Sequence, residues 1–233
     1  MKGLGIVVAG GAGALGRAVV SALLDRGARV AVPFRSAAGW DALRAEAGPG
    51  AALWGGTADL SDPRSAAAFV DEAAAWLGGV DGVAALAGAY TGSGTLETAP
   101  AGEWEGMIRA NLSTVYGLCR ASLPHLLKRG GSVVTVASRL AQDGGAGAAA
   151  YAVSKAGVVT LTRVLALENR DRGVRFNCVM PAVIDTPANR SAMPGADASR
   201  WTPPEVIARV IVFLLSPESA AVNGAVLPVD GKG

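Results

Sequence analysis

Histidine and cysteine are nearly absent from this chain of 233 residues, which has only His125, Cys119 and Cys178. A single histidine gives no basis for a Ser-His-Asp triad, and no cluster of metal-ligating residues is visible, so we expect no metal site. One cysteine falls in a predicted helix and the other in a predicted strand, which favours two buried thiols over a disulfide. Acid–base chemistry must therefore fall to another residue type.

An excess of charge of either sign is also lacking. Lys and Arg number 21 and Asp and Glu 19, and the two signs are interspersed, which argues against a nucleic-acid groove or a polybasic membrane patch. The longest apolar run, 206–215, contains Arg209 and is too short to span a bilayer. Because the first predicted strand begins near the N-terminus, no secretory signal fits. We expect a cytoplasmic enzyme without nucleic-acid or membrane partners.

Short apolar runs that alternate with helical segments are abundant. The pattern predicts strands at 4–9, 29–34, 51–58, 81–87, 132–137, 173–179 and 225–229, and helices at 13–26, 62–77, 101–128, 148–170 and 202–215. This alternation predicts one α/β domain over residues 1–233, a doubly wound Rossmann-type fold whose seven-stranded parallel sheet has helices on both faces. We expect the cofactor half at about 1–130 and the catalytic and substrate half at about 131–233.

A glycine-rich turn, Gly10-Gly-Ala-Gly13-Ala-Leu-Gly16, follows the first predicted strand and opens a helix. Glycines there permit a tight turn and bring backbone N–H groups close to a pyrophosphate at the helix N-terminus. The turn therefore predicts dinucleotide binding, with contacts from Gly10, Ala12, Gly13, Ala14, Leu15 and Gly16.

The end of the second predicted strand bears on cofactor choice. An NAD-preferring protein commonly has an acid there, whereas this chain has Phe34-Arg35-Ser36. Arg35 offers a bidentate partner for a 2′-phosphate and Ser36 a second donor, so we predict NADP(H). Asp59 is predicted to bind the adenine amino group, although it could instead merely end a strand. The other predicted cofactor contacts follow later strands: Leu60, Ala87, Gly88, Pro181, Ile184 and Thr186.

The segment Tyr151-Ala-Val-Ser-Lys155 places a phenol and an amine on one helix face. A phenol with a pKa near ~10 needs a nearby cation to donate a proton near neutral pH, and Lys155 can supply it. Ser138, which ends a predicted strand, can hold a carbonyl oxygen while charge develops on it. The alternative is an exposed helical pair. Asn111 is predicted in mid-helix, where no propensity favours it, so a polar relay behind Lys155 is a further hypothesis.

Together these residues resemble the short-chain dehydrogenase/reductase family over essentially the whole chain. The resemblance implies a catalytic tetrad of Asn111, Ser138, Tyr151 and Lys155. In it, Tyr151 donates the proton and Ser138 orients the substrate. Lys155 binds the nicotinamide ribose beside Tyr151 and lowers the pKa of that phenol, and Asn111 holds a relay water. Because Ala85-Leu-Ala-Gly88 replaces the family's Asn-Asn-Ala-Gly, we expect altered cofactor affinity before altered chemistry.

The glycine turn and residues 185–203 also resemble dihydropteridine reductases, which reduce a quinonoid pterin. Those enzymes have an acid at the second strand and lack the serine found here as Ser138. We therefore predict NADPH-dependent reduction of a carbonyl on a small or medium organic molecule. The alternatives are a C=N reductase for a pterin or cyclic imine, and a non-catalytic dinucleotide sensor. The pocket walls are predicted at 89–98, 139–147 and 182–201.

The predicted helix over 156–168 has almost no polar face. A helix that is apolar on most sides must be covered on most sides, and the sheet covers only one of them. A homo-oligomer is therefore expected. The family resemblance implies a tetramer rather than a dimer, paired through this helix and the one that carries Asn111.

Overall fold

The apolar runs become the strands of one sheet. In the computed structural model, which describes residues 1–231, all strand pairs are parallel, in the order β3-β2-β1-β4-β5-β6-β7. Their bounds are β1 (Gly5–Ala9), β2 (Arg29–Phe34), β3 (Leu53–Thr57), β4 (Gly82–Ala85), β5 (Gly131–Val136), β6 (Val174–Pro181) and β7 (Val226–Val229). The order reverses between β1 and β4, which creates the crevice where ligands bind in open α/β sheets. The predicted fold class is confirmed.

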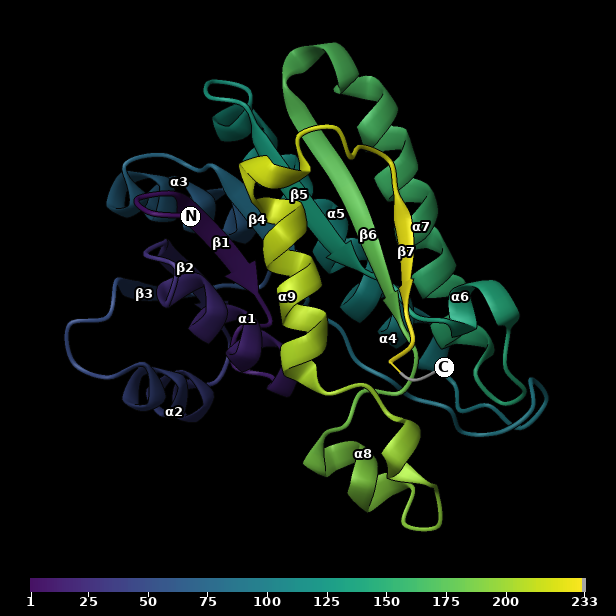
Figure 1. Cartoon of the computed structure of the whole chain (residues 1–233). Helices are drawn as coiled ribbons and strands as arrows, with labels where there is room; N and C mark the ends of the chain where they lie inside the picture. Colours follow the sequence, from purple (N-terminus) through teal and green to yellow (C-terminus); the bar gives the residue numbers. More distant parts are fainter. Residues whose placement is uncertain (232–233) are drawn as a thin grey trace.

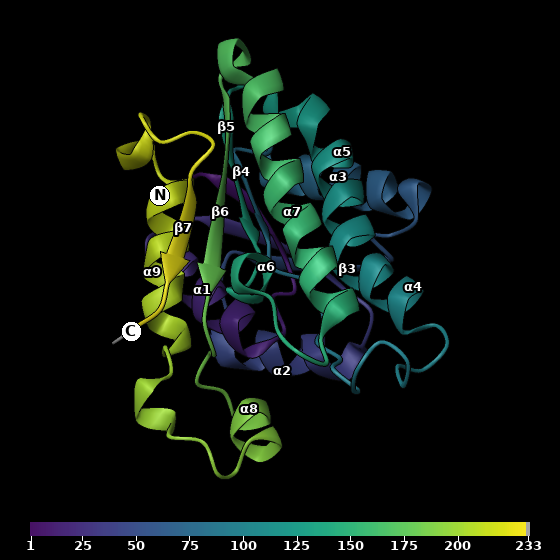
Figure 2. The ribbon, with the colours of Figure 1, turned by 90° about the vertical axis from the view of Figure 1, so that its right-hand side faces the viewer.

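Helices cover both faces of the sheet (Figures 1 and 2). One layer contains α1 (Ala14–Leu24), α2 (Ala37–Ala47) and α9 (Pro204–Leu215), and the other contains α3 (Pro63–Leu77), α4 (Glu103–Met107), α5 (Thr114–Leu126) and α7 (Ala149–Glu168). Short α6 (Leu140–Asp143) and α8 (Pro187–Ala192) follow the carboxyl ends of β5 and β6. A π-helix spans Ile108–Ser113, and 3-10 turns span Arg170–Arg172, Ala198–Arg200 and Pro217–Ser219.

Alternate residues of each strand enter different cores. Ile6 and Val8 of β1 pack with α1 and α9, whereas Val7 packs with α3, α5 and α7. This period of two follows from the pleat of a strand, and burial on both faces explains why the strands read as continuous apolar runs. The chain has few aromatic residues, so Val, Ile, Leu and Ala fill most of both cores.

The structure differs from the prediction at one missed helix and one divided helix. Helix α2 was not predicted, because only Leu43 in it is fully buried and its sequence shows little apolar periodicity. The predicted helix over 101–128 is divided into α4, a π-helix and α5, and Asn111 lies in the π-helical part. Single-turn π-bulges of this kind occur frequently at functional sites.

The prediction of two buried thiols is confirmed. Cys119 and Cys178 are buried free thiols, and burial raises the pKa of Cys119 to about 12. The Nε2 atom of His125 lies 2.8 Å from the carboxylate of Asp71 on α3. Within residues 1–231, α7 is the one helix long and apolar enough to cross a membrane by length and composition. It packs against β6, as helices of folded domains do.

Candidate active site

The glycine turn is built for close backbone approach. Gly10 has a φ of +80°, and a Cβ there would lie 2.8 Å from the backbone nitrogen of Ala87. A Cβ on Gly16 would collide with the carbonyl oxygen of Gly10. Helix α1 starts after Gly13 without a side-chain cap, which leaves N–H groups of its first turn for an anion. These features fit the pyrophosphate of a dinucleotide.

A cleft of about 770 Å³ opens beside this turn, at the carboxyl ends of β1 to β4. Thirteen predicted cofactor contacts line it: Gly10, Ala12, Gly13, Ala14, Leu15, Gly16, Arg35, Ser36, Asp59, Leu60, Ala87, Gly88 and Thr186. Four others, Tyr151, Lys155, Pro181 and Ile184, lie outside its lining. Several lining residues were not predicted, among them Pro33, Gly39, Ala110, Thr114 and Pro187. They flank predicted positions, and proximity in the chain was their only available signal.

The second strand ends in an aromatic stack. The ring of Phe34 lies parallel to that of Trp40 on α2, with centroids 5.3 Å apart. Trp40 also covers Gly55, where a Cβ would approach the indole to 2.7 Å. The Phe34 side chain is therefore packed against α2, and the exposed Arg35 is the charged group of this strand end that lines the cleft.

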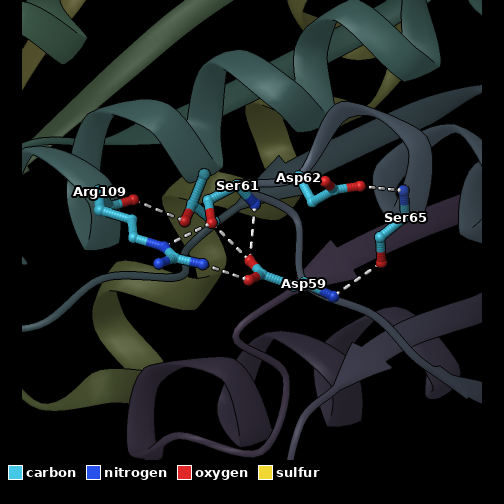
Figure 3. A network of polar contacts seen from close by, with 6 residues as sticks. Asp59, Ser61, Asp62, Ser65 and Arg109 are labelled. Atoms are coloured by element: carbon cyan, nitrogen blue, oxygen red, sulfur yellow. Dashed lines mark hydrogen bonds and ion pairs between the residues drawn. The ribbon is translucent and has the colours of Figure 1, made fainter.

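Asp59 belongs to a closed polar network (Figure 3). Its Oδ1 accepts hydrogen bonds from the Ser61 nitrogen (2.9 Å) and the Ser61 hydroxyl (2.6 Å), and its Oδ2 accepts from Arg109 Nη2 (2.8 Å). The bonds from Ser61, assisted by Arg109, lower the pKa of Asp59 to about 2. A carboxylate offers about four acceptor positions, so one remains for a donor such as an adenine amino group. The adenine contact of Asp59 stays a prediction, and Arg109 is a residue that the sequence did not reveal.

The two residues predicted for proton transfer, Ser138 and Tyr151, lie near the end of β5 and on α7. Ser138 follows β5 by two residues, and its hydroxyl lies close enough to the Tyr151 phenol to lower the pKa of that group. Burial raises the pKa of Tyr151 by more than Ser138 lowers it, so the phenol stays protonated at neutral pH, as a donor requires. Lys155 is not among the groups that shift the pKa of Tyr151 in the protein alone, so the lowering expected from it stays a prediction.

Lys155 is buried, with 5% of its surface exposed. Its Nζ donates to the Val136 carbonyl at 3.0 Å and lies 6.0 Å from the ring centroid of Tyr151. Burial lowers the pKa of Lys155 to about 8. A Cβ on Gly88 would come within 3.0 Å of the same Nζ. The missing side chain of Gly88, which lines the cleft, therefore leaves the space that the Lys155 ammonium and the Asn111 amide occupy.

Asn111 joins three segments of the site. Its Oδ1 accepts from the Ala89 nitrogen at 2.9 Å, and its Nδ2 donates to the Ala89 carbonyl at 3.0 Å and to Ser154 at 3.1 Å. The Ser154 hydroxyl in turn donates to the Tyr151 carbonyl at 2.7 Å. The amide thus fixes the loop after β4 to α7, and its relay role stays a prediction. Ser154 was missed, although a serine next to Lys155 was a readable signal.

The predicted substrate walls carry paired charges. Arg139 bonds to Asp143 at 3.1 Å and lies 3.4 Å from Asp230, and Arg190 bonds to Asp185 at 2.6 Å. The segment after β6 is also tied back by a parallel bridge between Ile184 and Thr202. On the opposite wall, the exposed ring of Tyr90 contacts the ring of Tyr151.

Known proteins share this arrangement. The family model described as enoyl-(acyl carrier protein) reductase matches residues 10–231. D-Threitol dehydrogenase of Mycolicibacterium smegmatis is 35% identical, covering 97% of this chain and 90% of its own. The crystal structure of levodione reductase has a TM-score of 0.93 at 30% identity and covers 99% of this chain and 97% of its own. The 3-ketoacyl-(acyl-carrier-protein) reductase from Brucella melitensis, solved with NADH, has a TM-score of 0.89 at 26% identity and covers 99% and 98%.

The sheet order, the glycine turn beside a dinucleotide-sized cleft, and the Ser138–Tyr151 pair next to Lys155 agree with these similarities. Members of this family bind a nicotinamide dinucleotide, and the cradle around Gly10 and Gly16 fits one. The chain therefore belongs to the short-chain dehydrogenase/reductase family of oxidoreductases.

Proposed function

We propose that this chain uses NADPH to reduce a carbonyl group on a small or medium-sized organic molecule. The observation that carries the proposal is the placement of Ser138 next to the Tyr151 phenol, beside the buried Lys155. The reduced nicotinamide, when bound, supplies the hydride. Ser138 holds the carbonyl oxygen as negative charge develops on it, and the Tyr151 phenol transfers its proton to that oxygen.

The Lys155 ammonium has a complementary role in this proposal. A pKa of about 8 leaves it mostly protonated at neutral pH, so it can donate to a nicotinamide ribose bound next to Gly88. An anionic Tyr151, left after proton transfer, is stabilised by this nearby cation. Reprotonation of Tyr151 then passes along the polar groups around Lys155, with Asn111 as the predicted relay residue.

The choice of NADPH rests on the end of β2. Arg35 lies exposed at the cleft and offers a bidentate partner for the 2′-phosphate, with Ser36 next to it. Phe34 cannot accept hydrogen bonds from the ribose hydroxyls, and its ring is packed on Trp40. A carboxylate that would anchor NADH is therefore missing from the position after β2 where one is usual.

Reduction of a C=N bond is the second candidate. Residues 185–203 resemble the corresponding segment of dihydropteridine reductases, and a cyclic imine could use the same proton donor. Ser138 weighs against a pterin, since those reductases lack it. A non-catalytic sensor is the remaining alternative, and the intact Ser138, Tyr151 and Lys155 weigh against it.

We also propose a homotetramer. Val153, Val164 and Leu167 on α7 and Tyr116 on α5 leave large apolar surfaces exposed. Exposed apolar area of this kind marks interaction surfaces. A second copy of the chain would cover it, and light scattering that finds a stable monomer at micromolar concentration would contradict the proposal. A cytoplasmic location stays a prediction from composition.

The test is NADPH oxidation, followed by absorbance, with a panel of cyclohexanone, 2-hexanone, a 3-ketoester, 1-pyrroline and a quinonoid dihydropterin. Saturable turnover of a ketone supports carbonyl reduction, whereas turnover of only the imine or the pterin supports the second candidate. NADPH binding by calorimetry without turnover of any member would favour the sensor. The same panel with NADH measures cofactor choice.

A further inference from the structure

Tyr90 lies directly on the proton donor. It follows Gly88 by two residues, and its ring meets the Tyr151 ring edge to face, with centroids 4.9 Å apart and planes at 78°. Even so, 62% of Tyr90 is exposed. This side chain therefore covers part of Tyr151 while it presents aromatic surface outward.

Gly92 leaves space for the Tyr90 hydroxyl. A Cβ on Gly92 would collide with the Tyr90 hydroxyl and lie 3.1 Å from the Gly147 carbonyl oxygen. Gly92 is not among the glycines with positive φ, so its backbone conformation does not require glycine. The reason for glycine here is therefore the space taken by the Tyr90 hydroxyl and the neighbouring loop.

The position of Tyr90 is coupled to the catalytic machinery. Asn111 bonds both the nitrogen and the carbonyl of Ala89, the residue before Tyr90. The same amide reaches Ser154, which lies between Tyr151 and Lys155 in the sequence. Asn111 is fully buried and holds both polar groups of the Ala89 backbone, so it fixes the position of the Tyr90 backbone relative to Tyr151.

Arg139 and Arg190, in the other two predicted substrate walls, are paired with acids, which favours an uncharged ligand. Arg139 follows Ser138 directly and is neutralised by Asp143 and Asp230. Arg190, in the segment after β6, is held by both oxygens of Asp185. Cations that are already paired do not attract a carboxylate or phosphate on a substrate, and hydrophobic contact with Tyr90 remains.

We propose that Tyr90 is a specificity-determining residue that selects neutral cyclic ketones by packing its ring against the ring of the substrate. A flat or chair-shaped ring placed beside Tyr90 brings its carbonyl toward Ser138 and Tyr151. A linear ketone of the same carbon number makes less contact with the aromatic face and must also lose conformational freedom on binding. The proposal rests on the proposed carbonyl reductase function and names its substrate class.

The test compares cyclohexanone with 2-hexanone, which have equal carbon numbers. Tyr90→Ala should lower kcat/KM for cyclohexanone about tenfold, mainly through KM, and for 2-hexanone less than about threefold. Tyr90→Phe keeps the ring and should retain the wild-type ratio. Gly92→Ala keeps Tyr90 but crowds its hydroxyl, so it should shift the ratio in the direction of Tyr90→Ala. An unchanged Tm and NADPH Kd show that each variant is folded.

Equal losses for the two ketones in Tyr90→Ala would overturn the proposal, because Tyr90 would then serve only to hold Tyr151. If the wild-type protein reduces no ketone, the proposed function fails, and Tyr90 is tested separately by ligand-detected NMR. Cyclohexanol should then bind the complex with NADP⁺ better than 2-hexanol does, and Tyr90→Ala should remove the difference. The same difference in both proteins would contradict the role of Tyr90.

Discussion

The two ends of the site are built from different parts of the chain. The dinucleotide end consists mainly of backbone. Gly10 and Gly16 lie at the carboxyl edge of the seven-stranded sheet and are packed too closely against neighbouring backbone to carry side chains. The predicted substrate end consists of side chains at and beside loops, held by ion pairs such as Arg139–Asp143 and by the contact between Tyr90 and Tyr151 on α7. Backbone fixed by sheet register leaves little freedom, whereas loop side chains can change without altering the fold. Cofactor binding should therefore be intolerant to small changes, whereas substrate choice should be adaptable.

The largest expected effect separates chemistry from binding. Tyr151→Phe removes the proton donor but keeps the ring, so turnover should fall by at least ~10²-fold while the NADPH Kd stays nearly unchanged. Steady-state kinetics and titration calorimetry measure the two quantities. Tyr116→Phe, on the exposed face of α5, is the matched control. Near-wild-type turnover in Tyr151→Phe would remove that residue from the mechanism.

The backbone character of the dinucleotide end is tested by a pair of alanines. Gly16→Ala places a Cβ against the Gly10 carbonyl, so the turn must open and the NADPH Kd should rise at least about tenfold. Gly13→Ala places a Cβ 3.4 Å from the same oxygen, an ordinary contact, and its φ of −76° suits alanine. Equal affinities in the two variants would show that the turn is less constrained than its geometry indicates.

Cofactor choice is the exception at this end, since a side chain should decide it. Arg35→Ala should weaken NADPH about ten- to hundredfold and leave NADH almost unchanged, because a charge-assisted contact contributes ~1.5–3 kcal/mol. Phe34→Asp should abolish the preference through repulsion of the 2′-phosphate. Arg120→Ala on α5 controls for net charge. Comparable dissociation constants of the unmodified protein for the two cofactors would refute this role of Arg35.

Lys155 lies between the two ends of the site. Its burial should make the free energy of unfolding depend on pH. Its pKa falls from 10.5 to about 8 on folding, so between these values the unfolded chain binds more protons than the folded one. The free energy of unfolding should therefore rise with pH from about 8 to 9.5, by up to ~1.4 kcal/mol per pH unit. Urea titrations measure it. Lys155→Met should remove this rise, and an unchanged slope would assign the effect to other groups.

The smallest effect on NADPH binding is expected from Arg109, whose exposed side chain pairs with Asp59 beside the cleft. Arg109→Gln breaks the ion pair with Asp59, but the Arg109 side chain is 70% exposed, and exposed pairs contribute about 0–1 kcal/mol. Ser61 continues to hold the Asp59 carboxylate, so the NADPH Kd should change only a few-fold. Calorimetry and thermal unfolding measure both quantities. A loss as large as that of Gly16→Ala would show that side chains matter as much as backbone at the dinucleotide end.

Strands and the glycine turn were predictable because their signals are local. A strand buried on both faces must be apolar throughout, and Gly10 and Gly16 stand directly after one. Features that depend on contacts across the fold were not predictable. Helix α2 shows little periodicity, and the stack of Trp40 on Phe34 appears only once the chain is folded. The pKa of Tyr151 rises because of burial, which the four-residue spacing to Lys155 does not encode.

The π-helix at Ile108–Ser113 has a consequence for the evolution of related chains. Arg109 points to Asp59, while Asn111, two residues later, reaches Ala89 and Ser154. A π-bulge holds one residue more than an α-helical turn, so its loss would restore α-helical phase and rotate one flank against the other by about 100°. Both contacts could not survive that rotation. Insertions and deletions should therefore accumulate in the loop over 91–102 and avoid 108–113, so this short stretch should align distant family members without gaps.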